Sequence, residues 1–307
     1  MSVAVIQGAS GALGLALSRH ILRHTNLKVY ALTHKPTSTE NELSEKISEG
    51  ADVSNSKEKI HDRLSVLGDV DVREERGLER AATIVKEREG NDRVRLIACM
   101  AGILHTEKSL SAIDPSTALS QFQINTLGHL LTYKHFVPLI PSRKSFQQLA
   151  SEWASEGEAT GSGDPAKGLV DKEGSLCWSM SARVGSIGDN ERGGWYSYRA
   201  SKAAVNQIVR TLDHELINKS SSAIAVGYHP GTVITPFTAP VIGDAAPEPS
   251  KGRFSVDQAI EKMVAVMRQV RRRRDVHQGT DARSSGAAGE PEWGGRCWDW
   301  KGEKIKW

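Results

Sequence analysis

The 307-residue sequence has few cysteines and no long hydrophobic run. Its three cysteines, Cys99, Cys177 and Cys297, are widely spaced and odd in number, which argues against a disulfide framework and favours a reducing, cytoplasmic environment. No stretch approaches the ~18 consecutive apolar residues of a membrane-spanning helix. The first residues run directly into a glycine-rich turn, so we predict neither a signal peptide nor a membrane partner.

The sequence also lacks an excess of charge of either sign. Forty Lys and Arg residues face 37 Asp and Glu residues, for a net charge of +3. This balance predicts no nucleic-acid partner, and we interpret the arginine run at 271–274 as a solvated stretch. His20 and His24 have a spacing that suits a metal ion, but no third ligand is evident, so no metal site is predicted.

Short apolar segments alternate with segments of helical periodicity along most of the chain. The predicted strands are 3–6, 28–32, 64–72, 93–99, 176–180 and 223–228. The predicted helices are 15–22, 42–47, 77–89, 115–138, 196–216 and 256–270. Strands that alternate with helices in this way indicate βαβ units. We predict an α/β fold, a Rossmann-type doubly wound parallel sheet that forms a single domain over residues 1–307.

Two stretches depart from this alternation. Residues 142–174 are rich in Ser, Glu, Gly and Lys, which predicts a surface insertion outside the sheet. Residues 239–290 are predicted to be a mobile segment. The tryptophans of the tail (Trp293, Trp298, Trp300 and Trp307) either cover a substrate pocket, form a subunit contact or pack against the sheet edge, and we favour the last interpretation.

A glycine-rich turn lies directly between the first predicted strand and the first predicted helix. Glycine there permits a tight turn and close backbone approach to a pyrophosphate, while the helix N-terminus offers free N–H groups and the positive end of its dipole. An ordinary strand-to-helix turn is the less favoured alternative in this context. The predicted dinucleotide-binding residues are Gly8, Ser10, Gly11, Ala12, Leu13 and Gly14.

The residues after the second predicted strand indicate which dinucleotide binds. An acidic side chain there would hold the ribose 2′-hydroxyl and repel a 2′-phosphate. The sequence instead has Thr33, His34 and Lys35, and its next carboxylate is Glu40. A hydroxyl, an imidazole and an ammonium can each bind a phosphate, so NADP(H) is favoured over NAD(H), with a solvated loop lysine as the alternative interpretation of Lys35.

Tyr198 and Lys202 lie four residues apart in a predicted helix, and therefore on one face of it. A free tyrosine, with a pKa of about 10, is a poor acid–base catalyst near neutral pH. A nearby ammonium favours the phenolate and lowers that pKa. We predict that Tyr198 is the general acid/base and that Lys202 tunes it and binds the nicotinamide ribose.

Together these motifs resemble those of the short-chain dehydrogenases/reductases, whose patterns are a TGxxxGxG loop, an NNAG strand end and a YxxxK pair. The segments 181–187, 193–202, 229–235 and 298–302 resemble in particular the C-factor/sniffer-like carbonyl reductases. The resemblance implies that Asn125 holds a water of a proton relay to Lys202. It further implies that the cofactor contacts Asp71, Val72, Ala101, Gly102, Pro230, Gly231, Thr232 and Thr235.

Three departures from the family pattern stand out. Gln7 replaces the usual threonine, and Cys99 and Met100 replace the usual asparagine pair, which we expect to weaken hydrogen bonds that steady neighbouring loops. The position of the substrate-orienting serine is Ala182. Either Ser181 or Ser186 could supply the hydroxyl instead, and we favour Ser181 as the catalytic serine.

The resemblance implies an NADP(H)-dependent oxidoreductase that interconverts a small-molecule carbonyl and alcohol, in a homodimer or homotetramer. Apolar residues after Thr235, namely Phe237, Ala239 and Val241, favour an apolar aldehyde or ketone. The alternative is a catalytically weak NAD(P)-binding signalling or sensor protein of the same fold. The absent serine favours that alternative, while Asn125, Tyr198 and Lys202 favour the enzyme.

Overall fold

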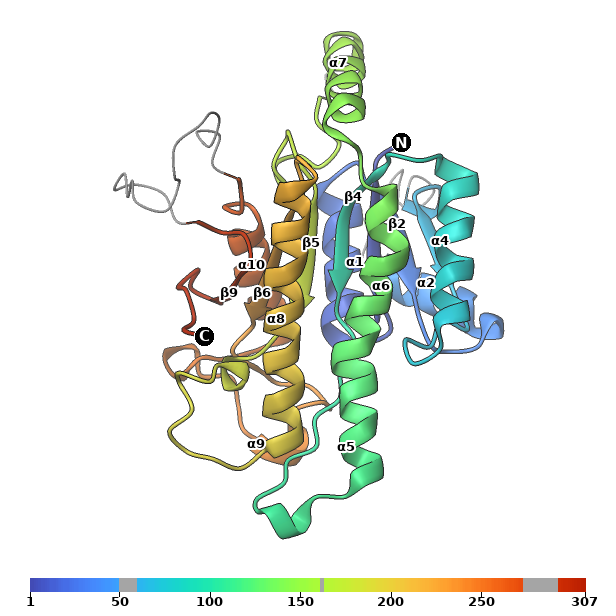
Figure 1. Cartoon of the computed structure of the whole chain (residues 1–307). Coiled ribbons are helices and arrows are strands. Elements are labelled where there is room, and N and C mark those ends of the chain that lie inside the picture. Colours follow the sequence, from blue (N-terminus) through green and yellow to red (C-terminus); the bar gives the residue numbers. More distant parts are fainter. Residues whose placement is uncertain (50–59, 161–162, 273–291) are drawn as a thin grey trace, which may run out of the picture.

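Seven parallel strands form one sheet at the centre of the molecule (Figure 1). This computed structural model describes residues 1–49, 60–160, 163–272 and 292–307. The sheet order is β3-β2-β1-β4-β5-β6-β9. The strands are β1 (Val3–Gln7), β2 (Lys28–Leu32), β3 (Leu64–Leu67), β4 (Val94–Cys99), β5 (Leu176–Met180), β6 (Ile224–His229) and β9 (Arg296–Asp299). The predicted α/β fold with a doubly wound parallel sheet is confirmed.

Helices cover both faces of this sheet (Figure 1). One face packs against α4 (Glu75–Glu89), α6 (Gly128–Phe136) and α8 (Tyr196–Asn218). The other packs against α1 (Ala12–His24), α2 (Glu40–Ser48) and α10 (Val256–Met267). Each face thus buries its own hydrophobic cluster, which explains why the apolar residues of β1 and β4 follow one another rather than alternate with polar ones, apart from Arg95 of β4 and Gln7 at the end of β1.

The remaining elements connect these layers. Helix α5 (Pro115–Phe122) begins at Asp114, whose carboxylate accepts a hydrogen bond from the Thr117 N–H, as its Asp-Pro start predicts. A π-helical segment (Gln123–Leu127) joins α5 to α6. The short α9 (Ala239–Ile242) and the pair β7 (Thr232–Val233) and β8 (Arg253–Phe254) follow β6.

The third strand is shorter than the predicted 64–72. It ends at Leu67, and the next residue, Gly68, packs so closely on Thr37 that a Cβ would lie 2.7 Å from its Cα. Asp69 then takes a positive φ of 53°, and its N–H bonds the Lys35 carbonyl. The chain therefore turns under the end of β2, so Asp71 lies in this loop rather than on the strand.

The described residues of the predicted insertion 142–174 contribute no strand to the sheet, and they contain an unpredicted helix, α7 (Arg143–Thr160). Figure 1 shows α7 at the opposite end of the molecule from α9. The fully buried Arg95 of β4 lies beneath it, with its guanidinium 4.8 Å from the ring centroids of both Phe146 and Trp153. Its N–H groups donate to the Asp164 carboxylate and to the Gly174 and Asp171 carbonyls.

The C-terminal tail packs against the sheet edge as β9, with Trp293 and Trp298 buried, in agreement with the favoured interpretation. Of the predicted mobile segment 239–290, residues 239–272 include α9, β8 and α10, whereas 273–290 lie outside the described residues. The arginine run falls partly there as well. No helix among the described residues has the length and apolar character to cross a bilayer.

Candidate active site

The glycine turn has the shape that a dinucleotide requires. Gly8 takes a φ of 80°, and a Cβ on it would lie 2.6 Å from the Ala101 nitrogen. A Cβ on Gly14 would collide with the Gly8 carbonyl oxygen. Helix α1 begins at Ala12 after Gly11, whose position receives no side-chain cap. The first N–H groups of α1 have no side-chain cap, and the turn before them requires glycine at positions 8 and 14, an arrangement that suits an anion.

Polar side chains gather beside this turn at the end of β2. The Thr33 hydroxyl donates to Ser10 Oγ at 3.0 Å, so the strand end and the glycine turn are tied together. His34 and Lys35 follow and are both exposed. A phosphate that reached this corner would meet Ser10, His34 and Lys35 without a facing carboxylate on the strand end.

The predicted adenine-contacting residues lie on the neighbouring loop. The Asp71 carboxylate binds the Arg73 guanidinium, and this hydrogen bond holds the pKa of Asp71 below its usual range. Val72 is buried against Gly128, where a Cβ would lie 2.8 Å from the Val72 side chain. Asp71 is thus half-buried beside the β2 corner, while Val72 is largely covered by α6.

Asn125 connects the end of β4 to α8. It lies within the π-helical segment, is fully buried, accepts from the Ile103 N–H at 2.8 Å and donates to the Ile103 carbonyl at 2.9 Å. Its amide also donates to Ser201 Oγ at 3.2 Å. A π-bulge turns a side chain off the regular helical register and often marks a functional position. Here it directs Asn125 to the segment after β4.

The side chains of Asn125, Lys202 and Phe237 converge on Gly102. A Cβ placed on Gly102 would lie 3.2 Å from Asn125 Oδ1, 3.8 Å from Lys202 Nζ and 3.8 Å from the Phe237 ring. Lys202 Nζ lies 5.9 Å from the Tyr198 ring centroid, as their helical spacing predicts. It also donates to the Met180 carbonyl at the end of β5, at 2.8 Å.

Burial dominates the electrostatics of the Tyr198–Lys202 pair. Tyr198 is 6% exposed, and this burial raises the pKa of its hydroxyl well above the usual value. Burial lowers the pKa of Lys202 from 10.5 to about 8. The lowering of the Tyr198 pKa that the sequence predicted is therefore absent, because removal from water disfavours both charged forms. Tyr198 holds its proton at neutral pH.

The two candidate serines differ in their hydrogen bonds. Ser181, the predicted catalytic serine, is buried and donates to Asn206 Oδ1 at 2.6 Å, on the side where α8 packs on the sheet. Ser186 is also buried, and its Oγ accepts from the Asp189 N–H at 3.1 Å. Ala182 lies between them without a hydroxyl. The preference for Ser181 is therefore not supported, because its hydroxyl already has a structural partner.

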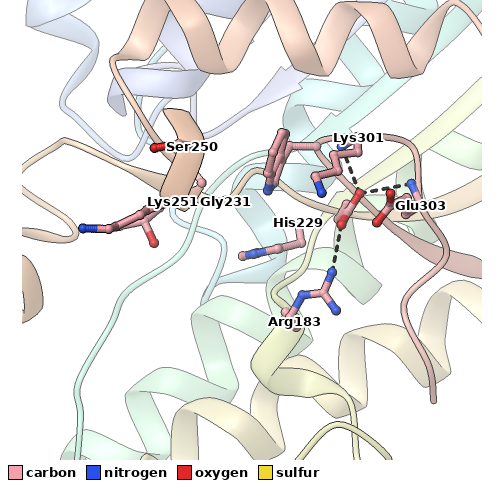
Figure 2. A pocket seen from close by; sticks show the side chains of 11 residues that line it. Arg183, His229, Gly231, Ser250, Lys251, Lys301 and Glu303 are labelled. Atoms are coloured by element: carbon pink, nitrogen blue, oxygen red, sulfur yellow. Dashed lines mark hydrogen bonds and ion pairs between the residues drawn. The ribbon is translucent and has the colours of Figure 1, made fainter. Parts of the chain in front are cut away.

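The segment after β6 lies beside a separate pocket. Thr232 donates its N–H to the Gly252 carbonyl, and Gly231, with a φ of 75°, packs on Phe254. The Thr235 hydroxyl bonds the Val233 carbonyl, and Pro230 is half-buried beside them. Figure 2 shows the pocket, about 370 Å³ in volume. It is lined by Arg183, His229, Gly231, Thr232, Ser250, Lys251, Gly252, Asp299, Trp300, Lys301 and Glu303.

This pocket shares Gly231 and Thr232 with the predicted nicotinamide residues but not Tyr198 or Lys202. In this pocket the Arg183 guanidinium, labelled in Figure 2, donates a hydrogen bond of 2.8 Å to the Asp299 carboxylate. The pocket is therefore bordered by the end of β6, by residues 231–232 and by the C-terminal tail.

Sequence reasoning missed several residues that shape the site. Trp195, which was not predicted, places its ring centroid 6.3 Å from that of Tyr198, and Phe237, which was predicted as an apolar residue of the substrate region, places its own at 6.4 Å. Gln121 and Glu107 both bind the buried Ser197 hydroxyl at the start of α8. The sequence did offer a signal for Gln121. It lies four residues before Asn125, so the two polar side chains are expected on the same helix face.

Among the described parts of the chain, no cluster of His, Cys, Asp or Glu could hold a metal ion. The His20 and His24 rings lie 4.4 Å apart, and burial lowers the pKa of His20 to about 4. His20 is half-buried and His24 is exposed, so the two rings stack at the surface near the end of α1.

No family model matches the chain. A curated relative, 1-hydroxy-2-glutathionyl-2-methyl-3-butene dehydrogenase from Rhodococcus sp., is 28% identical over 57% of this chain and 62% of its own length. An uncharacterized oxidoreductase from Schizosaccharomyces pombe is 24% identical over 77% of this chain and 76% of its own. The C-signal protein of Myxococcus xanthus is 27% identical over 42% of this chain and 58% of its own.

Solved structures share the fold. The carbonyl reductase Sniffer of D. melanogaster matches with a TM-score of 0.70 at 18% identity, over the whole of both chains. An NADPH-bound carbonyl reductase from chicken fatty liver matches with a TM-score of 0.67 at 20% identity, again over both whole chains. The chain is thus similar in sequence to a dehydrogenase and an oxidoreductase, and in fold to carbonyl reductases, in agreement with the resemblance that its motifs show.

Proposed function

We propose that this protein is an NADP(H)-dependent oxidoreductase that interconverts a carbonyl and an alcohol, with Tyr198 as general acid/base. The observation that carries the proposal is the convergence of Asn125, Lys202 and Phe237 on Gly102, one residue beyond Ala101, which contacts the glycine turn. A site for a dinucleotide and an acid–base pair are therefore adjacent at the carboxyl end of the sheet, where ligands bind in open α/β folds.

The residues present fit NADP(H). The cradle that a Cβ would fill at Gly8 and Gly14 admits a pyrophosphate against the start of α1. Ser10, His34 and Lys35 would receive the 2′-phosphate. The names of the chicken carbonyl reductase and of a Burkholderia multivorans short-chain dehydrogenase/reductase include NADPH and NADP, which supports the same choice.

When bound, the nicotinamide supplies or accepts a hydride. The side chains of this chain manage the proton. Tyr198 keeps its proton at neutral pH because of its burial and can donate it to a carbonyl oxygen in its reach. The Lys202 ammonium near the Tyr198 ring stabilises the phenolate that remains. Asn125 holds the Ile103 backbone, and a water relay from Asn125 to Lys202 stays part of this proposal.

The substrate that fits best is an apolar aldehyde or ketone. The rings of Trp195 and Phe237 lie near that of Tyr198. Val241 of α9, four residues after Phe237, is 40% exposed. These apolar groups favour burial of a hydrocarbon or aromatic substituent next to the reacting oxygen.

The decisive test is Tyr198→Phe, with Tyr196→Phe as matched control. Tyr196 lies two residues earlier on α8 and is 40% exposed. We expect Tyr198→Phe to lower kcat for NADPH-dependent carbonyl reduction by about 10²–10⁴-fold, because general acid catalysis contributes that much. NADPH binding, followed by its fluorescence, should stay within about twofold. Equal turnover by Tyr198→Phe and Tyr196→Phe would refute the mechanism.

A catalytically weak NAD(P)-binding sensor is the second candidate. Ala182 lacks a hydroxyl, and the hydroxyls of Ser181 and Ser186 bind protein groups. The relative from Myxococcus xanthus bears the name C-signal, which fits such a role. NADPH binding without oxidation in the presence of aldehydes, ketones and quinones would favour the sensor over the reductase.

We also propose a homodimer or homotetramer. The helices bearing Asn125 present four exposed apolar side chains, Leu119, Phe122, Leu127 and Leu130. Exposed apolar patches of this kind mark protein interfaces. Sedimentation of the purified protein measures its assembly directly. The cytoplasmic location and the lack of a nucleic-acid partner stay predictions.

A further inference from the structure

The segment that follows β4 has both backbone polar groups of Ala101 bound by side chains. The Ala101 N–H donates to Gln7 Oε1 at 3.0 Å, and the Ala101 carbonyl faces His129 Nε2 at 3.4 Å. Two residues on, Asn125 binds the N–H and the carbonyl of Ile103. Gln7, Asn125 and His129 are each fully buried. A three-residue stretch is therefore held from three elements, β1, the π-helical segment and α6.

The hydrogen bonds of His129 have a defined direction. A carbonyl only accepts, so Nε2 carries the proton toward Ala101. Nδ1 of the neutral ring then accepts from Ser179 Oγ at 3.2 Å, and Ser179 Oγ in turn accepts from the Tyr133 hydroxyl at 2.7 Å. Burial lowers the pKa of His129 to about 3, which keeps the ring neutral. The chain of hydrogen bonds runs from Tyr133 through Ser179 and His129 to the Ala101 carbonyl.

Residues 101–103 contact both the glycine turn and the surroundings of Lys202. Ala101 packs on Gly8 so closely that a Cβ there would lie 2.6 Å from the Ala101 nitrogen. Gly102 lies against Asn125 and Lys202. A small shift of Ala101 would therefore alter the glycine turn and the surroundings of Lys202 at once.

We propose that Gln7 and His129 are positioning residues that hold Ala101 and Gly102 in the conformation that binds the cofactor. The proposal rests on the proposed function for the identity of the ligand. Cys99 and Met100, which precede the segment, carry no side-chain amide that could do this. The expectation that the changes at Gln7, Cys99 and Met100 weaken hydrogen bonds is thus corrected for Gln7, because its side chain makes one.

The variants His129→Leu and Gln7→Met test the proposal. Each removes one hydrogen bond to Ala101 and keeps a side chain of similar bulk. We expect the Kd for NADPH to rise about three- to tenfold, the range that one lost hydrogen bond gives. KM for NADPH should rise in parallel, and kcat at saturating NADPH should fall by a smaller factor than the affinity for NADPH. His129→Gln, which keeps a donor near the position of Nε2, should restore most of the affinity.

Ser175→Ala is the matched control. Ser175 is equally buried and bonds the Val94 carbonyl at the opposite end of β4, at 3.1 Å. It should alter unfolding by urea as the other variants do and leave the Kd for NADPH unchanged. A Kd that rises equally in Ser175→Ala, or stays unchanged in both His129→Leu and Gln7→Met, would overturn the proposal, since a merely structural role predicts those results.

Amide hydrogen exchange in the cofactor-free protein gives a second, independent readout. Gln7→Met should speed exchange of the Ala101 amide about tenfold, and the control Ser175→Ala should not. If the Ala101 amide exchanged at the same rate in Gln7→Met as in the unaltered protein, the proposal that Gln7 positions Ala101 would be overturned. If the unaltered chain binds no NADPH, the proposed function fails. Faster exchange in Gln7→Met would then still establish that Gln7 holds the segment, and only the link to the cofactor would be lost.

Discussion

The two sides of the candidate site are built differently. On the cofactor side, the glycine turn and residues 101–103 are closely packed, and buried side chains bind the backbone groups of Ala101 and Ile103. On the proposed substrate side, the rings of Trp195 and Phe237 lie near that of Tyr198, and position 182 lacks a hydroxyl. The proposed cofactor side is therefore closely held by buried side chains, whereas the proposed substrate side lacks the hydroxyl that the family pattern has at position 182.

The substitution Ala182→Ser probes the difference most strongly. A hydroxyl there would donate to the substrate oxygen as charge develops on it, so we expect kcat to rise about 10²-fold, near the effect of one such donor elsewhere. The Kd for NADPH should stay unchanged because the cofactor side is untouched. Steady-state kinetics with a reactive aldehyde measures the change, and Ser181→Ala serves as control. An unchanged kcat would mean that another group already orients the substrate.

Lys202, which borders both sides, gives a stability test. Its pKa of about 8 in the folded protein lies below the 10.5 of the exposed side chain. Between these pH values the unfolded chain binds more protons, so stability rises with pH. The free energy of unfolding of the wild type relative to Lys202→Met should therefore increase by about 3 kcal/mol from pH 7 to 10.5. Urea unfolding at both pH values measures it, and parallel pH profiles would contradict it.

Lys35→Ala should have the smallest effect and should be confined to the cofactor side. Because Lys35 is exposed, its attraction to a 2′-phosphate is partly screened, and we expect about a tenfold rise in the Kd for NADPH. Binding of NADH, which lacks that phosphate, should not change. Lys28→Ala, which removes a lysine at the other end of β2, is the control. Equal losses for NADPH and NADH would point to a contact other than the 2′-phosphate.

Much of the fold could be predicted because its signals are local. Buried parallel strands are continuous apolar runs, and the Asp-Pro pair at Asp114 marks the start of α5. The early end of β3 could not be predicted, because it depends on the packing of Gly68 against Thr37. Helix α7 was missed because its polar composition hides a small apolar cluster, which includes Phe146 and Trp153.

The candidate site could be predicted where a motif has fixed spacing. Tyr198 and Lys202 are close because a helix brings residues four apart together. The pKa of Tyr198 could not be predicted, since it depends on how much of the side chain tertiary packing buries. The partner of Ser181 was equally hidden, because Asn206 lies on another element.

The guanidinium of Arg95 makes the core strand β4 and the α7 region interdependent. Without Phe146, Trp153 and Asp164, the buried guanidinium would lose both ring contacts and its carboxylate partner and would keep the Gly174 and Asp171 carbonyls as acceptors. Helix α7 therefore cannot be trimmed as an ordinary surface loop could. A shortened version of this protein needs an apolar side chain at position 95 in the same step, and a homologue that lacks the helix should lack the arginine as well.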